Sequence, residues 1–272
     1  MTSPRRVAVI GDVAGHLEEL VGELRRLGAD PETGTLPADL VVIQVGDLVH
    51  RGPESAAVVA LVDRYLTDVP DQWLQLVGNH EAQYLREPVF TWPEQLPEEA
   101  ADTLRRWWDS GQLRVAAAVV TPEERYLITH AGLTAGFWRS VLGAPGDVRQ
   151  AVAALNALPS GRGDAVFRAG ELLGRRRDSA AGPLWAVASS ELVPSWQDSL
   201  LPFSQVHGHT SVFDWSHRRF APGPPVTAAL TNLDEEAKHA VVTLRGGRII
   251  GIDPGHEERP RRPWRSWEVS VT

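Results

Sequence analysis

The sequence predicts an α/β fold built on a parallel sheet, and two observations lead to this prediction. First, short apolar runs alternate with segments of helical periodicity along the first third of the chain, a pattern that favours parallel strands joined by right-handed crossovers. Second, each of the first three apolar runs ends in glycine followed by a polar residue. These pairs are Gly11-Asp12, Gly46-Asp47 and Gly78-Asn79. Since ligands bind at the carboxyl ends of parallel strands, we expect these polar side chains to lie at one sheet edge.

The individual elements follow from this periodicity. Strands are predicted over residues 7–10, 40–45 and 73–77, and helices over 17–27 and 56–66. Leucines at helical spacing define the first helix, and Gly28 supplies its stop signal.

The second half of the chain is less regular. It predicts a helix over 100–109 and strands over 115–120 and 126–129, the last running into His130. A hairpin is expected over 240–252, turning at Gly246-Gly247. The predicted organisation is one domain over residues 1–253 with a helical cap or insertion at 134–200, which includes helical segments near 147–157 and 164–174. A C-terminal extension rich in proline and arginine follows at 254–272.

Composition excludes several classes of protein. A chain of 272 residues with 43% hydrophobic and 23% charged residues is neither disordered nor fibrous. It has no cysteine, which excludes disulfides, thiolate metal sites and cysteine nucleophiles. The net charge of −8 disfavours DNA and anionic membranes as partners. With no apolar run of membrane-spanning length and no secretory signal pattern, the expected location is the cytoplasm.

Five segments place a metal-ligating side chain after a short apolar run. They are Gly11-Asp12, Gly46-Asp47, Gly78-Asn79-His80-Glu81, Thr129-His130-Ala131-Gly132 and Gly208-His209-Thr210. Carboxylate, amide oxygen and imidazole together suit Mn, Fe or Zn. A carboxylate that bridges two cations about 3.5–4 Å apart is the arrangement used for two-metal hydrolysis of phosphate esters.

The ordered set GD…GDLVHRGP…GNHE…HAGL…GHT resembles the calcineurin-like metallophosphoesterases. It is most similar to the phosphoprotein phosphatase branch with its bacterial serine/threonine phosphatases and symmetrical diadenosine tetraphosphatases. The resemblance covers residues 11–210. It implies a two-sheet β-sandwich flanked by helices, with the metal site at the strand ends.

The resemblance also implies roles for individual residues. Asp47 matches the bridging aspartate, and Asp12 matches a ligand of one metal. The remaining ligands of the other metal match Asn79, His130 and His209. Arg51 matches a phosphate-binding arginine, and His80 matches the histidine that protonates the leaving alcohol. The substrate contacts predicted in this way are Arg51, Asn79 and His50. The nucleophile implied by the resemblance is a metal hydroxide.

The sequence departs from the family pattern at three positions. Ala14 stands where the family has a metal-ligating histidine, so one metal site is expected to be firm and the second weaker. His50 stands where an aspartate orients the catalytic histidine, and imidazole cannot stabilise a protonated His80 as a carboxylate would. Ala186 stands where an arginine often follows Leu184-Trp185, so phosphate affinity is lower or supplied by the Arg175–Arg177 run.

Together these features predict a phosphoesterase that depends on a divalent metal, Mn²⁺ above Fe or Zn. Two alternatives stay open: an inactive relative that binds phosphate, nucleotide or a partner, and an enzyme of this fold adapted to a specialised biosynthetic hydrolysis. The substrate is expected to be a phosphorylated protein, a nucleotide or a small metabolite. The oligomeric state is not readable from the sequence. Among the tryptophans, Trp107, Trp108 and Trp138 are the ones expected nearest to a cleft.

Overall fold

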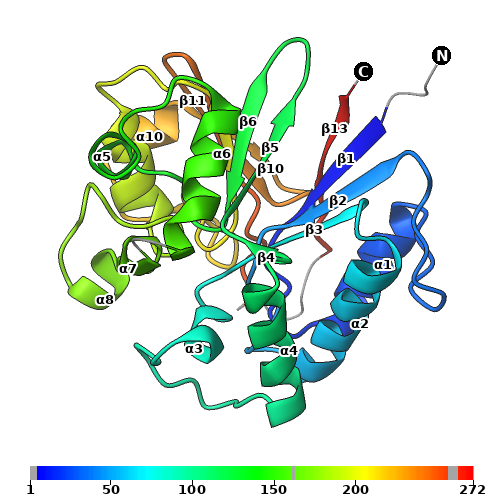
Figure 1. Ribbon diagram of the computed structural model, residues 1–272. Helices are drawn as coiled ribbons and strands as arrows, with labels where there is room; N and C mark the ends of the chain where they lie inside the picture. Colours follow the sequence, from blue (N-terminus) through cyan, green and yellow to red (C-terminus); the bar gives the residue numbers. More distant parts are fainter. Residues whose placement is uncertain (1–4, 161–162, 257–262, 272) are drawn as a thin grey trace.

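Two large sheets form the centre of the molecule (Figure 1). The computed structural model describes residues 5–160, 163–256 and 263–271. The first sheet has the order β13-β1-β2-β3-β4, in which β1 to β4 run parallel and β13 pairs antiparallel with β1. Its strands are β1 (Arg5–Ile10), β2 (Leu40–Gln44), β3 (Trp73–Leu76), β4 (Leu113–Arg114) and β13 (Trp267–Val271).

The second sheet has the order β10-β11-β12-β7-β6-β5. Its central strands β12, β7 and β6 are parallel, whereas the outer pairs are antiparallel. Its strands are β5 (Ala116–Val120), β6 (Arg125–Thr129), β7 (Ser204–His207), β10 (Thr231–Asp234), β11 (His239–Leu244) and β12 (Gly247–Gly251). The predicted hairpin is confirmed as the β11–β12 pair. A small ribbon of β8 (Phe213–Asp214) and β9 (Arg219–Phe220) lies apart from both sheets.

Helices flank the outer faces of the sheets (Figure 1). Beside the first sheet lie α1 (Leu17–Arg26), α2 (Ser55–Asp68) and α4 (Glu98–Asp109), with the short α3 (Ala82–Leu85) near the end of β3. On the side of the second sheet lie α5 (Ala135–Ser140), α6 (Val148–Ala157), α7 (Gly163–Val166), α8 (Glu171–Gly174), α9 (Val193–Trp196) and α10 (Pro225–Ala229). A 3-10 turn (Leu158–Ser160) and a π-helical turn (Ala188–Leu192) complete this region.

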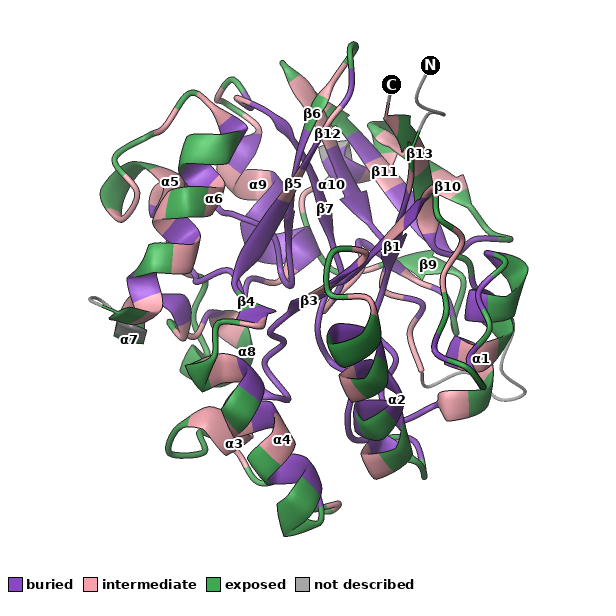
Figure 2. Ribbon diagram, turned by 45° about the vertical axis from the view of Figure 1, so that its right-hand side comes forward, coloured by how far each residue is buried: buried purple, intermediate pink, exposed green. Residues whose placement is uncertain are grey.

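The alternation of side chains along each strand builds the layers. In β1, Val7 and Val9 join the apolar cluster between the two sheets, whereas Ala8 and Ile10 join the cluster beneath the helices. Figure 2 shows the central strands buried and the outer turns of α2 and α4 exposed. Because both faces of the parallel strands are covered, apolar residues predominate in them, although Gln44 and Gln75 are also buried there. The predicted two-sheet α/β fold is therefore confirmed.

One expected element is confirmed and one differs. The strand predicted over 115–120 is β5, which begins at Ala116, where the chain has left the first sheet after β4 and entered the second sheet. Asn156 accepts hydrogen bonds from the backbone N–H groups of Val115 and Ala116 at this crossing. The helical segment expected near 164–174 consists of the two short helices α7 and α8.

The predicted division into a domain, a cap and a C-terminal extension stays a prediction. Within the extension the structure forms β13, which gives the first sheet an edge strand. No helix among the described residues is both long enough and apolar enough to cross a membrane.

Candidate active site

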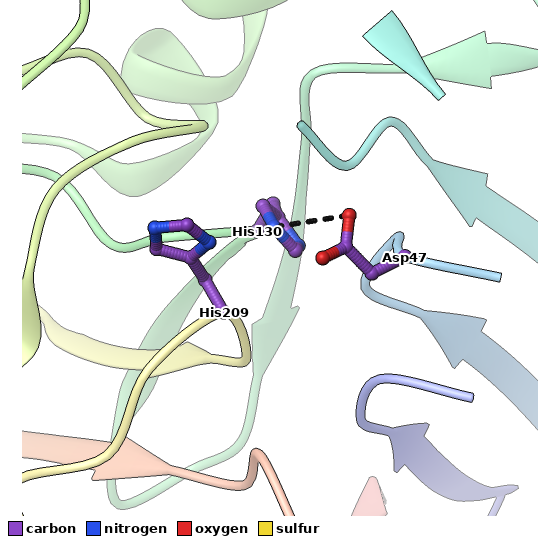
Figure 3. Close-up of side chains that lie close together, drawn as sticks. All are labelled: Asp47, His130 and His209. Carbon is purple, nitrogen blue, oxygen red and sulfur yellow. Dashed lines mark ion pairs between the residues drawn. The ribbon is translucent and has the colours of Figure 1, made fainter. Parts of the chain in front are cut away.

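The carboxyl ends of strands from both sheets bring the predicted site residues to one place. Asp12 follows β1, Asp47 follows β2 and Asn79 follows β3 in the first sheet. His130 directly follows β6, and His209 lies two residues beyond β7 in the second sheet. Figure 3 shows the side chains of Asp47, His130 and His209 pointing toward one another from these loops.

A cluster of unusual backbone conformations marks the loops that carry these side chains. Asp47, His50, Arg51 and His209 have φ values of 55°, 72°, 67° and 65°, in the left-handed region that side chains with a Cβ rarely adopt. Such conformations persist only where the surrounding structure enforces them, and they concentrate at functional sites.

Hydrogen bonds to Glu81 hold the loop at Asp47 in its strained conformation. Its carboxylate is fully buried and accepts hydrogen bonds of 2.8 Å from the backbone N–H groups of Asp47, Leu48 and Gly78. Burial raises the pKa of this carboxyl to about 7. Gly78 is required here, because a Cβ at that position would overlap the Asp47 side chain and backbone. Sequence reasoning noted Glu81 only as part of a motif and missed its bracing contacts.

The donor atoms of Asp47, His130 and His209 all lie within 4.8 Å of one another. The Nε2 atom of His209 is buried and has no hydrogen-bond partner. Burying a polar atom without a hydrogen-bond partner costs free energy. A ligand bound to this nitrogen would remove that cost.

His130 points to the same conclusion. Its Nδ1 lies 3.1 Å from the backbone oxygen of Val45 and donates its hydrogen there, which leaves the lone pair on Nε2. That Nε2 lies 2.9 Å from Oδ1 of Asn79 and 3.4 Å from Oδ1 of Asp47. The lone pairs of His130 Nε2, Asn79 Oδ1 and Asp47 Oδ1 thus face one another with no hydrogen between them. A cation bound among the three atoms would remove their mutual repulsion. A backbone carbonyl behind a ligating imidazole is also the usual partner that fixes its tautomer.

Electrostatics support the same ligand set. Burial lowers the pKa of His209 to about 3 and that of His130 well below its usual value, so both imidazoles are neutral, as metal ligands must be. Burial raises the pKa of the Asp47 carboxyl to about 7. An uncompensated buried carboxylate disfavours its own charge, and a bound cation removes that penalty.

Asp12 lies outside this group of three. Its two carboxylate oxygens lie 3.0 and 3.2 Å from the backbone nitrogen of His209, which donates to them. Since α1 begins at Leu17 with His16 as its N-cap residue, Asp12 is not the N-cap of that helix. Burial, followed by the negative charges of Asp253 and Asp47, raises its pKa well above the ordinary range.

A pocket of about 270 Å³ opens beside Asp12 and Asp47. Ala14 lines it and offers no ligand atom, while the exposed side chain of Arg51 also faces it. Asp253 and His256 line the same pocket, and the His256 ring donates from Nε2 to the backbone oxygen of Asp12. Sequence reasoning missed both residues, since they belong to the predicted extension or its boundary.

His80 stands next to the three-residue group, with its Nε2 3.8 Å from Oδ2 of Asp47. Its Nδ1 lies 2.8 Å from Nδ1 of His50, and Nε2 of His50 lies 2.7 Å from the hydroxyl of Tyr84. Burial lowers the pKa values of both histidines to about 3, which keeps both rings neutral. His50 is 1% exposed, so its ring lies against His80 and Tyr84 and away from solvent.

The aromatic residues beside the site differ from those expected. Trp92 stacks on His50 at 5.8 Å, meets His80 edge-on at 4.9 Å and lies under the Arg51 guanidinium at 5.2 Å. Trp185 meets His209 edge-on at 6.0 Å. By contrast Trp107 is fully buried in the core, Trp108 packs on Phe167, and Trp138 packs on Trp196. Spacing alone could not separate these tryptophans, because only Trp185 stands in a segment compared with the family pattern.

A family profile described as calcineurin-like phosphoesterase matches residues 5–232. The chain belongs to the calcineurin-like phosphoesterase family. This family implies a divalent metal and a hydrolase, and the matched region contains every candidate ligand described above.

Curated relatives and solved structures agree with this assignment. The chain is 33% identical over 135 residues to the symmetrical bis(5'-nucleosyl)-tetraphosphatase of Klebsiella pneumoniae strain 342, covering 46% of this chain and 43% of that protein. It is 35% identical over 82 residues to serine/threonine-protein phosphatase 1 of Salmonella typhimurium, covering 30% of this chain and 32% of that one. The chain therefore spans less than half the length of these relatives. The cold-active protein-tyrosine phosphatase of a Shewanella species shares the fold, with a TM-score of 0.51, 16% identity, and coverage of 91% of this chain and 78% of that one.

Proposed function

We propose that this protein is a metal-dependent phosphoesterase that hydrolyses phosphate esters or anhydrides. The observation that carries the proposal is the convergence of acceptor atoms from Asp47, Asn79 and His130 beside the unpartnered Nε2 of His209. Membership in the calcineurin-like phosphoesterase family supports the reaction class.

In this proposal Asp47, Asn79, His130 and His209 hold one firm metal ion, for which Mn²⁺ is the first candidate and Fe or Zn the next. Asp12 and Asp47 would hold a second ion more weakly, because Ala14 contributes no ligand. The bound metal supplies an activated water and Lewis-acid stabilisation of the phosphoryl group. A mixed set of carboxylate, amide and imidazole suits these borderline first-row ions.

The remaining residues would act on the substrate. Arg51 presents a planar guanidinium to the pocket beside Asp12 and Asp47, which suits phosphate oxygens. His80 stands beside Asp47 and would interact with the leaving-group oxygen. The predictions that His50 and Asn79 contact substrate stay predictions, and the buried position of His50 favours a role through His80.

The substrate class proposed from the relatives is a phosphorylated protein, a dinucleoside polyphosphate or another nucleotide, with small phosphorylated metabolites also possible by the same chemistry. The cytoplasmic location stays a prediction.

The test is hydrolysis of 4-nitrophenyl phosphate by metal-stripped protein titrated with Mn²⁺. We expect saturable activity that His130→Ala abolishes and that the exposed control His217→Ala retains. If the wild-type protein binds Mn²⁺ and phosphate yet hydrolyses no faster than His130→Ala, the proposal is wrong and the inactive binding protein takes its place.

A further inference from the structure

Arg51 has a fixed backbone, with a φ of 67° in the left-handed region, and an exposed side chain. Before it, the N–H of His50 donates to Oγ of Ser55 at 2.8 Å. After it, the N–H of Gly52 donates to the backbone oxygen of Ala14 at 2.8 Å. A long exposed side chain samples many rotamers, so holding it in one of them costs conformational entropy. The position of the guanidinium therefore depends on what the end of the side chain packs against.

Trp92 provides a contact for that guanidinium. The Cζ atom of Arg51 lies 5.2 Å from the centroid of the Trp92 ring, within the distance of about 6 Å at which a cation is attracted to an aromatic face. Tryptophan is the aromatic residue that gives the strongest contact of this kind. Arg51 also lines the pocket beside Asp12 and Asp47. Because a cation–π contact uses no N–H donor, it is compatible with hydrogen bonds from the same guanidinium to phosphate oxygens.

Two buried imidazoles hold the half-buried ring of Trp92 in place. Trp92 stacks on His50 with 5.8 Å between the ring centroids and 13° between the ring planes. It meets the ring of His80 edge-on at 4.9 Å. His50 and His80 are 1% and 4% exposed, so the plane of the Trp92 ring is set from inside the protein. A chain of ring contacts thus runs from buried His50 through Trp92 to the exposed guanidinium of Arg51.

Resting on the phosphoesterase function above, we propose that Trp92 is a positioning residue that holds the guanidinium of Arg51 at the phosphate pocket, with the ring of His50 as its support. Two departures from the family pattern fit this role. Ala186 stands where an arginine often follows, so the chain lacks that guanidinium and the placement of Arg51 matters more. His50 stands where the pattern has an aspartate, and its imidazole offers the ring face on which Trp92 stacks.

The test is a double-mutant cycle on the binding of radiolabelled inorganic phosphate to Mn²⁺-loaded protein, measured by equilibrium dialysis. Trp92→Leu should raise the Kd for phosphate about three- to tenfold, because Arg51 loses its cation–π contact. In an Arg51→Ala background, the same Trp92→Leu change should alter the Kd by less than about 1.5-fold, since Trp92 acts through the guanidinium. An unchanged Kd in Trp92→Leu, an equal rise in both backgrounds, or wild-type protein that binds no phosphate would overturn the proposal.

Two further variants separate this role from a general loss of packing. Trp92→Phe keeps a smaller ring face and should give a Kd between those of the wild-type protein and Trp92→Leu; it also decides the question if Trp92→Leu does not fold. The matched control is Trp108→Leu, since Trp108 is half-buried like Trp92 and packs on Phe167. Its Kd for phosphate should stay within about twofold of wild type. A Kd raised equally by Trp108→Leu, or a wild-type Kd in every Trp92 variant, would contradict the proposed role.

The support from His50 is tested by comparing two variants that both lose its nitrogen atom beside His80. His50→Phe keeps a ring behind Trp92, whereas His50→Leu does not. The Kd for phosphate should therefore be higher in His50→Leu than in His50→Phe, by about twofold or more. Equal Kd values would refute the supporting role of His50.

Turnover of 4-nitrophenyl phosphate distinguishes this inference from the proposed function. Trp92→Leu should raise KM about three- to tenfold and leave kcat within about twofold, because Arg51 holds phosphate oxygens in the ground state as well as in the transition state. If the wild-type protein hydrolyses nothing but the dialysis cycle shows coupling, the phosphoesterase function fails and the placement of Arg51 by Trp92 stands. If the wild-type protein hydrolyses the ester and Trp92→Leu binds phosphate equally well, this inference alone fails.

Discussion

Removing the carboxylate of Glu81 tests whether it holds the metal-binding loop in place. The three backbone N–H groups that it accepts come from Asp47, Leu48 and Gly78, and Asp47 is itself in a strained conformation at φ 55°. In Glu81→Ala all three donors lose their partner. In Glu81→Gln the amide oxygen can still accept from the N–H groups of Asp47 and Gly78, which both bond to Oε2 in the wild-type protein. The amide NH₂ then faces the N–H of Leu48, and that donor has no acceptor.

The magnitudes follow from these counts. An unsatisfied buried donor costs about 1–3 kcal/mol, so Glu81→Gln should lower the free energy of unfolding by about 1–3 kcal/mol. Glu81→Ala should cost about 3 kcal/mol or more, toward the lower end of the summed range, because water can enter the vacated space and satisfy part of the loss. Since the loop positions a candidate ligand, the Kd for Mn²⁺ should rise about 10- to 100-fold in Glu81→Gln.

Glu191 provides a matched control. It is also a buried carboxylate that accepts three backbone N–H groups, from Glu171, Asp178 and Val187, but these belong to the segment around α8 and the π-helical turn. Urea unfolding and Mn²⁺ titration calorimetry would be run on both glutamine variants. Glu191→Gln should lose comparable stability and keep its Mn²⁺ affinity. Equal losses of affinity in the two variants, or none in Glu81→Gln, would refute the reasoning.

Three further predictions concern the metal-binding loops. Ala14→His places a metal-binding side chain at a residue with φ 50°, a conformation that histidine tolerates. Equilibrium dialysis should show that the weaker site binds Mn²⁺ at least about tenfold more tightly. Unchanged stoichiometry and affinity would contradict this prediction. Because the pKa of Asp47 is raised to about 7 in the metal-free protein, Mn²⁺ must displace a proton, so affinity should fall about tenfold per pH unit below 7 and level off above it. Titration calorimetry in buffers of different ionisation enthalpy measures how many protons are released when Mn²⁺ binds. An Mn²⁺ affinity that does not change with pH would argue against the raised pKa of Asp47. Gly208→Ala places a Cβ against the Asp12 carboxylate and should destabilise the fold by about 1–3 kcal/mol in urea, whereas wild-type stability would show that the loop relaxes freely.

Strand topology brings the predicted site residues together, while their roles stay predictions. In parallel strands the carboxyl ends meet at one edge, so Asp12, Asp47 and Asn79 needed only correct strand boundaries to be brought together. His130 and His209 followed from the resemblance, and their loops meet the same edge from the second sheet. The strand predicted over 115–120 is present as β5, but its place in the second sheet was not predicted, because a crossing between sheets changes no periodicity; Asn156 accepts backbone hydrogen bonds at that crossing.

The contacts behind the site residues could not be predicted, since they join segments with no common pattern. Tyr84 lies in the short helix α3, 34 residues from His50, and hydroxyl and imidazole meet only after the chain has folded. The aspartate-to-histidine departure at His50 was visible in the sequence and was interpreted as a loss of charge stabilisation. The structure adds what the sequence could not contain, namely the Tyr84 hydroxyl 2.7 Å from Nε2 of that imidazole. A substitution that removes a carboxylate can thus keep a ring nitrogen 2.8 Å from Nδ1 of His80, so its effect on the site depends on contacts that only the folded chain brings together.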